Sequence, residues 1–157
     1  MAKLFISCPM KELSGVEIAE IRAFMLKQAM IVWPEEEFEV METAIPPEEG
    51  HKRMSVHCLG RSIQMLADAD YYIGVEDYPI IDYHTGCDIE NHVARMYVRP
   101  LEGCKYDSNL YFIHNASQIP VFQKLIDKIR EEKRKTYTCE PRYLTPVKEN
   151  VNEKSED

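Results

Sequence analysis

The chain has little basic charge and no long hydrophobic run. Its 157 residues include 19 Lys and Arg against 27 Asp and Glu, a net charge of −8. Phosphate backbones are bound by clustered Lys and Arg, so this balance argues against a nucleic-acid polymer as partner. Small anionic ligands stay possible, because a few backbone amides bind them. The apolar run at residues 4–10 is too short for a signal peptide or a membrane span, so no membrane partner is expected.

Motifs for disulfides, metals and the usual nucleotide cofactors are also missing. The five cysteines show no CxxC spacing, and an odd count without a framework indicates reduced thiols in the cytoplasm. His57 beside Cys58, and His92 near Cys87, do not have a zinc-binding spacing. The first loop, residues 7–15, is neither a P-loop nor a GxGxxG element. We therefore expect no metal site and no cofactor.

Short apolar segments alternate with amphipathic ones along the chain. Strands are expected at residues 3–8, 37–41, 70–75 and 110–113, and helices at residues 14–33, 57–67, 86–97 and 117–135. Ser14 and Glu17 have the spacing of a capping box at the start of the first helix. This order predicts an α/β fold, with a parallel sheet covered by helices on both faces. Residues 1–135 fit one domain, and the polar residues 136–157 are expected to be mobile or at a subunit contact.

Ligands of such folds bind at the carboxyl ends of the strands, where the loops 7–14, 43–52 and 76–86 converge. Glu90 follows the third loop, and we expect it in the first turn of a helix. Free amides there carry partial positive charge, which favours an ionised carboxylate. A carboxylate in this place can attack a sugar carbon, although acidic residues also stabilise first turns without any chemistry.

Other residues compete with Glu90 or could assist it. Cys87 is a rival nucleophile, because a helix N-terminus lowers a thiol pKa. Asp68 and Asp70 flank the third strand and could face the cleft, although local backbone bonding is the commoner role of Asp. Lys11 could bind a phosphate or simply be solvated. Several tyrosines suit a stacked nucleobase, although at least one is expected to be an ordinary strand residue: Tyr71, Tyr72, Tyr78, Tyr83 and Tyr97.

Three segments together resemble one enzyme family. They are Lys-Leu-Phe-Ile-Ser-Cys-Pro-Met at 3–10, Leu-Ala-Asp-Ala-Asp-Tyr-Tyr at 66–72, and Gly-Cys-Asp-Ile-Glu-Asn-His-Val-Ala at 86–94. The chain is similar here, over roughly residues 3–100, to nucleoside 2-deoxyribosyltransferases and the related deoxynucleoside monophosphate N-glycosidases. The resemblance implies a three-layer flavodoxin-like or Rossmann-like fold with a five-stranded parallel sheet. It also implies a homo-oligomer, a dimer or higher, whose neighbouring subunits complete each site.

The resemblance further implies a double displacement at the anomeric carbon of a nucleoside or nucleotide. Glu90 would attack that carbon and expel the base, and water or a second base would then attack the glycosyl-enzyme, as in retaining glycosidases. Asp88, His84 and Asp70 would orient groups or supply the acid. The positions expected to bind substrate are Ser7, Cys8, Pro9, Met10, Ser62, Gly86, Asn115 and Ser117.

The chain departs from the family at the partners of Glu90. Leu4 and Phe5 stand where many relatives have a strand tyrosine, Ser62 where they have an Asp, and His84 where they have Asp or Ser. Ser62 could replace the missing side chain as a hydroxyl ligand. His84, with an ordinary pKa near 6.5, could protonate a leaving base. Two alternatives stay open: a non-catalytic nucleotide-binding module on the same fold, and an interaction protein that docks a partner through residues 124–157.

Overall fold

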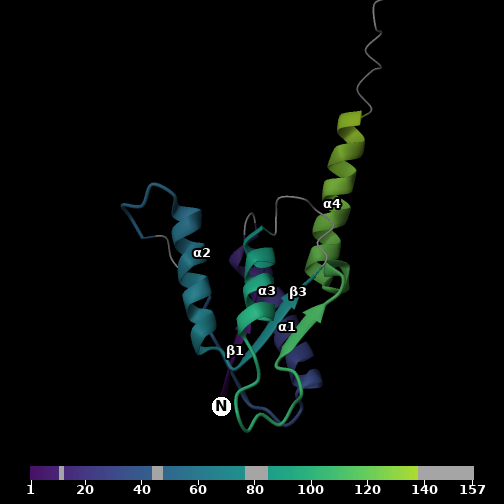
Figure 1. Ribbon diagram of the computed structural model, residues 1–157. Helices are drawn as coiled ribbons and strands as arrows, with labels where there is room; N and C mark the ends of the chain where they lie inside the picture. The colour runs from purple at the N-terminus through teal and green to yellow at the C-terminus, as the bar shows by residue number, and fades with distance from the viewer. Residues whose placement is uncertain (11–12, 44–47, 77–84, 138–157) are drawn as a thin grey trace, which may run out of the picture.

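A computed structural model describes residues 1–10, 13–43, 48–76 and 85–137 of the chain (Figure 1). The strands are β1 (Ala2–Ile6), β2 (Phe38–Val40), β3 (Tyr71–Val75) and β4 (Leu110–Ile113). The helices are α1 (Gly15–Val32), α2 (Met54–Met65), α3 (Thr85–Tyr97) and α4 (Pro120–Tyr137), with short 3-10 turns η1 (Leu66–Asp68) and η2 (Ala116–Gln118). Strands and helices alternate along the chain, as the sequence predicts.

All strand pairs in the described residues are parallel, in the order β2-β1-β3-β4. This confirms the predicted α/β class, and the order is that of the first four strands of a flavodoxin-like sheet. The described residues form four strands rather than the five that the family resemblance implies. The chain leaves β1 for β2 on one side and later places β3 on the other side. The carboxyl ends of β1 and β3 therefore flank the switch point at which such folds bind ligands.

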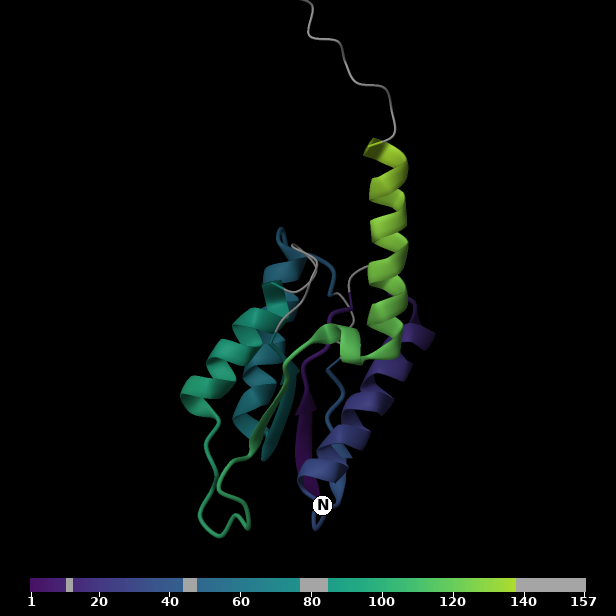
Figure 2. The ribbon, with the colours of Figure 1, turned by 90° about the vertical axis from the view of Figure 1, so that its right-hand side faces the viewer.

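The helices form a layer on each face of the sheet. Figure 2 shows α2 and α3 on one side of the strands and α1 and α4 on the other, and the contacts within each helix pair agree. The far half of α4 runs past the carboxyl edge of the sheet (Figure 2). The result is the three-layer arrangement expected for this class. No helix in the described ranges is long and apolar enough to cross a membrane.

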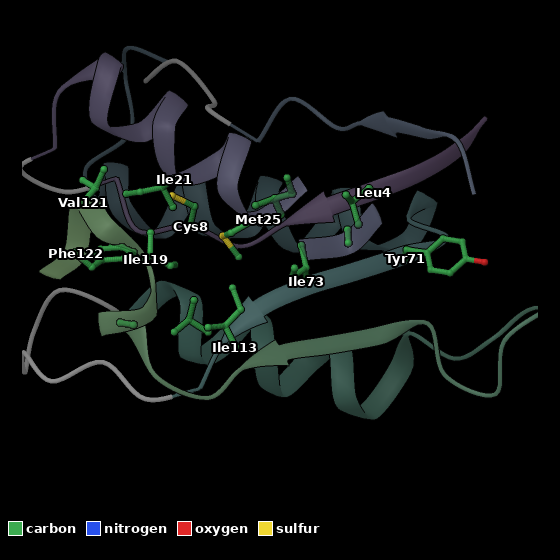
Figure 3. Close-up of a cluster of buried hydrophobic side chains, with 14 of the residues drawn as sticks. Leu4, Cys8, Ile21, Met25, Tyr71, Ile73, Ile113, Ile119, Val121 and Phe122 are labelled. Atoms are coloured by element: carbon green, nitrogen blue, oxygen red, sulfur yellow. The ribbon is translucent and has the colours of Figure 1, made fainter. Parts of the chain in front are cut away.

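Each face of the sheet has its own hydrophobic core, because successive strand side chains point to opposite faces. The core under α1 and α4 includes Leu4, Ile73 and Ile113 (Figure 3). The core under α2 and α3 includes Phe5 and Tyr72, whose rings stack at 5.6 Å. The residues of β3 are all buried, which agrees with a central parallel strand covered on both faces.

The helix ends agree with the sequence wherever a capping signal exists. Ser14 caps α1, and both hydrogen bonds of the predicted capping box with Glu17 are present. α2 begins at Met54, three residues before the predicted start, and Arg53 makes no side-chain cap that could have marked this. The last helix begins at Pro120 rather than Ser117, because proline suits the first helical position and residues 116–118 form the separate turn η2.

Candidate functional site

Three elements meet at the carboxylate of Glu90. Ser7, directly after β1, donates a hydrogen bond of 2.5 Å from Oγ to Glu90 Oε2. Ser62, on α2, donates from Oγ to the other carboxylate oxygen, Oε1. Both serines are buried, with 1% and 7% of their surfaces exposed. The structure therefore brings together three of the residues predicted for the site, one from each of three distant segments.

The position of Glu90 on α3 differs from the prediction. α3 begins at Thr85, so Glu90 is its sixth residue and lies in the second turn, and Asp88 is the acidic residue of the first turn. The free amides of a helix belong to its first four residues. The carboxylate of Glu90 is consequently held by the two serine hydroxyls. This corrects the expectation that the free amides at the start of the helix stabilise it.

Burial raises the pKa of Glu90, and the hydrogen bonds from Ser62 and Ser7 lower it, with burial the larger effect. The carboxyl group is therefore less acidic than an ordinary glutamate. Each carboxylate oxygen accepts one hydrogen bond from a serine hydroxyl. Because a carboxylate oxygen has two lone pairs, each can accept one further hydrogen bond. A carboxyl group oriented on both oxygens can act as a nucleophile when ionised or as an acid when protonated.

A second polar pair lies behind Glu90. Asn91 accepts a hydrogen bond of 2.6 Å from the Tyr72 hydroxyl and donates one of 2.7 Å to the Val75 carbonyl. Burial raises the pKa of Tyr72, and the charge of Glu90 raises it further. This pair joins α3 to β3 next to the carboxylate. Sequence reasoning missed Asn91, and the signal that could have found it is its place directly after Glu90.

Gly74 gives the Tyr72–Asn91 pair the room it needs. A Cβ added to Gly74 would collide with Asn91 Oδ1 and lie 3.1 Å from the Tyr72 hydroxyl. Gly86, by contrast, has space for a side chain, because its nearest neighbour would be Leu59 Cδ1 at 4.0 Å. Of the two glycines in this region, Gly74 is therefore the one that the packing requires.

The other predicted residues after β1 are placed differently from Ser7, although Glu90 is near enough for its charge to raise the pKa of Cys8. Cys8 is buried in the core under α1 and α4, and its thiol donates to the Pro9 carbonyl at 3.4 Å. Burial raises the pKa of Cys8 to about 12. Pro9 is also buried, whereas Met10 is exposed. Successive side chains alternate between faces, so Ser7 and Cys8 point to opposite sides of the sheet.

Asp70 lies at the wrong end of the sheet to assist Glu90. It precedes β3, and its carboxylate accepts a hydrogen bond of 2.8 Å from the backbone amide of Lys3. The five residues of β3 separate it from the carboxyl edge by about 16 Å. Two cavities of about 520 and 470 Å³ lie at this amino end, and Asp70 lines both. This corrects the prediction that Asp70 orients groups or supplies an acid at Glu90 of the same subunit.

The remaining candidates have mixed placements. Asp88 is exposed on α3, one turn or less from Glu90. Asn115 follows β4 and accepts a hydrogen bond of 2.9 Å from the amide of Ser117, so it caps η2. His84 lies outside the described residues, as do Lys11, Tyr78, Tyr83 and residues 138–157.

The rival nucleophile Cys87 is buried, with 6% of its surface exposed, and Asp68 is exposed on η1 at the amino end of β3.

No family model, curated protein or solved structure matches this chain. The resemblance to nucleoside 2-deoxyribosyltransferases consequently depends on the three quoted segments alone.

Proposed function

We propose that this protein cleaves or exchanges the N-glycosidic bond of a nucleoside or nucleoside monophosphate, with Glu90 as the nucleophile. The observation that carries this proposal is the carboxylate of Glu90, oriented on both oxygens by Ser7 and Ser62 next to the switch point between β1 and β3. No catalytic cofactor is needed, because the reaction is a pair of displacements at one carbon.

The reaction begins with ionised Glu90 attacking the anomeric carbon. The bond from that carbon to the base breaks, the electron pair leaves with the base, and an ester joins the sugar to Glu90. Water or a second base then attacks the same carbon and releases the carboxylate. The serine hydroxyls hold the carboxylate in one orientation, which reduces the entropy lost on reaching the near-attack geometry. Burial makes the carboxylate more basic than an exposed one, which favours bond formation to carbon.

A proton for the leaving base would come from Asp88 or His84 in this proposal. Asp88 is exposed on the same helix as Glu90, so it can face a bound substrate. His84 follows from the sequence alone, because it lies outside the described residues. As in the family that the chain resembles, we expect a homo-oligomer whose neighbours complete the site. Cysteines 8, 58, 87 and 104 form no disulfide among the described residues, and the cytoplasmic location that we propose would keep them reduced.

One observation favours a second candidate, a nucleotide-binding module without turnover. Both carboxylate oxygens of Glu90 already accept a hydrogen bond from a buried serine. Such a carboxylate also serves to tie β1, α2 and α3 together, with no chemistry at all. A binding module would keep its affinity for nucleotides but would release no base.

The deciding experiment replaces Glu90 with Gln and with Ala and measures base release and base exchange by chromatography. Deoxynucleosides, ribonucleosides and their monophosphates are the substrates. Loss of a covalent nucleophile lowers the rate by about 10³-fold or more. Glu20, exposed on α1, supplies the matched control Glu20→Gln, which should keep full activity.

Mass spectrometry of the wild-type protein stopped during turnover should detect a glycosyl ester on the peptide that contains Glu90. Undiminished turnover by Glu90→Gln would exclude the mechanism. If the wild type shows tight nucleotide binding by calorimetry and no base release, the binding module is the correct function.

A further inference from the structure

A second group of side chains lies at the start of α2, outside the Glu90 site. Glu48, His51 and His57 place a carboxylate oxygen and two imidazole nitrogens within 4.8 Å of one another. Glu48 Oε2 is 3.4 Å from His57 Nε2 and 3.9 Å from His51 Nε2. The two rings stack with centroids 3.8 Å apart and planes 15° apart. One carboxylate oxygen therefore faces both imidazoles.

The nitrogen of His57 has no satisfactory partner. Its Nε2 atom is buried and makes no hydrogen bond, even though Glu48 Oε2 is 3.4 Å away. A buried polar atom that lacks a hydrogen bond destabilises a folded protein. Something that accepts a lone pair from this nitrogen would remove that cost. A metal ion does so, whereas a proton would still need an aligned acceptor.

The orientation of the Glu48 carboxylate is set by a neighbouring arginine. Arg61, one turn beyond His57 on α2, pairs with Glu48 Oε1 and leaves Oε2 for the imidazoles. Ligating carboxylates in metal sites are commonly held in this way by a hydrogen bond to the other oxygen. The Arg61–Glu48 pair is neutral as a unit, so an ion here would be bound chiefly by its donor atoms.

We propose that Glu48, His51 and His57 form a site for a divalent transition-metal ion of the Zn²⁺ class. Two imidazoles and one carboxylate are a ligand set that zinc accepts, with a fourth position left for water or another ligand. Calcium and magnesium prefer oxygen ligands, so the two imidazoles argue against them. Ligand atoms around tetrahedral zinc are about 3.3 Å apart. The His57–Glu48 distance is close to this spacing. The ring of His51 is stacked nearly parallel to that of His57, so it has to rotate about its side-chain bonds before both nitrogen lone pairs point at one ion.

The metal site is independent of the proposed glycosidic chemistry, although α2 contributes to both. His57 precedes Ser62 by five residues, about 7.5 Å along the helix axis. The sequence predicts no metal site, because His57 and Cys58 lack a zinc-binding spacing and because the spacing Glu-x2-His-x5-His matches no familiar zinc motif. An ion would join the segment before α2 to the first turn of that helix.

The test is calorimetric titration of the full chain with Zn²⁺, after treatment with a chelator and in reducing buffer. We expect one equivalent to bind and the melting temperature to rise with Zn²⁺ concentration. His51→Gln, His57→Gln and Glu48→Gln should each weaken binding by about tenfold or more, since even loss of a residue that supports a ligand costs 10–100-fold.

Two controls exclude other sources of binding. His114 pairs with Glu76 at 2.7 Å on an exposed surface, so His114→Gln removes an imidazole next to a carboxylate without touching the site. Cys58→Ser tests whether a thiol on the same helix holds the ion. Both variants, and Glu90→Gln, should bind Zn²⁺ as tightly as the wild type.

The proposal is overturned if the wild type binds less than one equivalent, if both histidine variants bind normally, or if Cys58→Ser abolishes binding. His51 is half-exposed, so His51→Gln should fold and decides the outcome if His57→Gln does not. Melting temperatures measured without metal establish that each variant is folded. Failure of this titration leaves the assays on Glu90 unaffected, because Glu90 is not a ligand.

Discussion

Ser7 Oγ donates a hydrogen bond of 2.5 Å to Oε2 of Glu90, 83 positions later in the sequence. Ser7 is fixed by its place at the end of β1, where its amide also donates to the Ile73 carbonyl of β3 at 2.9 Å. The serine that orients the carboxylate is thus tied to the sheet by a backbone hydrogen bond, directly after the end of β1. Sites supported by strands hold their geometry closely, which a displacement at carbon requires.

Replacing Ser62 or Ser7 with Ala should shift the pH dependence of activity. Each hydroxyl lowers the pKa of Glu90, so its loss raises that pKa, and the acidic limb of kcat/KM moves to higher pH. A hydrogen bond to a charged group contributes about 1.5–3 kcal/mol, so kcat/KM should fall about tenfold or more. Ser55→Ala, exposed on the same helix as Ser62, should change neither quantity. An unmoved limb in the double Ser7 and Ser62 variant would show that Glu90 ionisation does not control the rate.

Replacing Glu90 with Gln should stabilise the fold at neutral pH. Burial raises the folded-state pKa of Glu90, so between the unfolded and folded pKa values the native state binds more protons. The stability of the wild type therefore falls as pH rises through that window, and the penalty is complete above it. The Gln variant does not ionise and avoids the penalty. Urea unfolding at several pH values should show a gain that disappears below about pH 4.5, the ordinary Glu range. A variant less stable than the wild type at pH 7 would contradict this.

Gly74→Ala should destabilise the protein, whereas Gly60→Ala should not. The new methyl at position 74 collides with Asn91 and crowds the Tyr72 hydroxyl, and overpacking of this kind costs about 1–3 kcal/mol. Gly60 is exposed within α2 with no atom near its Cβ position, so alanine there gains up to about 1 kcal/mol in helix propensity. Urea unfolding of both variants checks the pair. Equal stabilities would mean that the Tyr72–Asn91 contact is not tightly packed.

Cys8 should resist alkylation in the folded protein. Burial raises its pKa to about 12, so roughly one thiol in ten thousand is ionised at pH 8, and the thiolate is the reactive form. Cys58 and Cys104 are only half-buried and should react with iodoacetamide first. Peptide mapping by mass spectrometry after timed labelling measures this, and unfolding in urea should make Cys8 reactive. Rapid native labelling of Cys8 would show that its core opens.

Local patterns predict the elements of this fold closely. Alternation of apolar strands with amphipathic helices gives the order of β1 to β4, and the Ser14–Glu17 spacing marks the start of α1 correctly. Where no side chain caps a helix, the observed start differs from the predicted one, as at Met54, because no capping residue there marks the boundary in the sequence. The start of α3 lies at Thr85, one residue before the predicted start, and Glu90 lies in the second turn of this helix and not in the first as expected.

Contacts between distant segments are a different matter. The sequence alone determined that strands and helices alternate, that the sheet is parallel, and that Glu90 follows β3. The family resemblance placed Ser7, Ser62 and Glu90 in one site, and only the tertiary structure decided that both hydroxyls bond the Glu90 carboxylate. It also decided that Asp70 lies at the opposite edge, and that Glu48, His51 and His57 gather beside α2. Periodicity reports which face of an element is apolar. It does not report which faces and strand ends come together, because packing and register across the sheet set those positions.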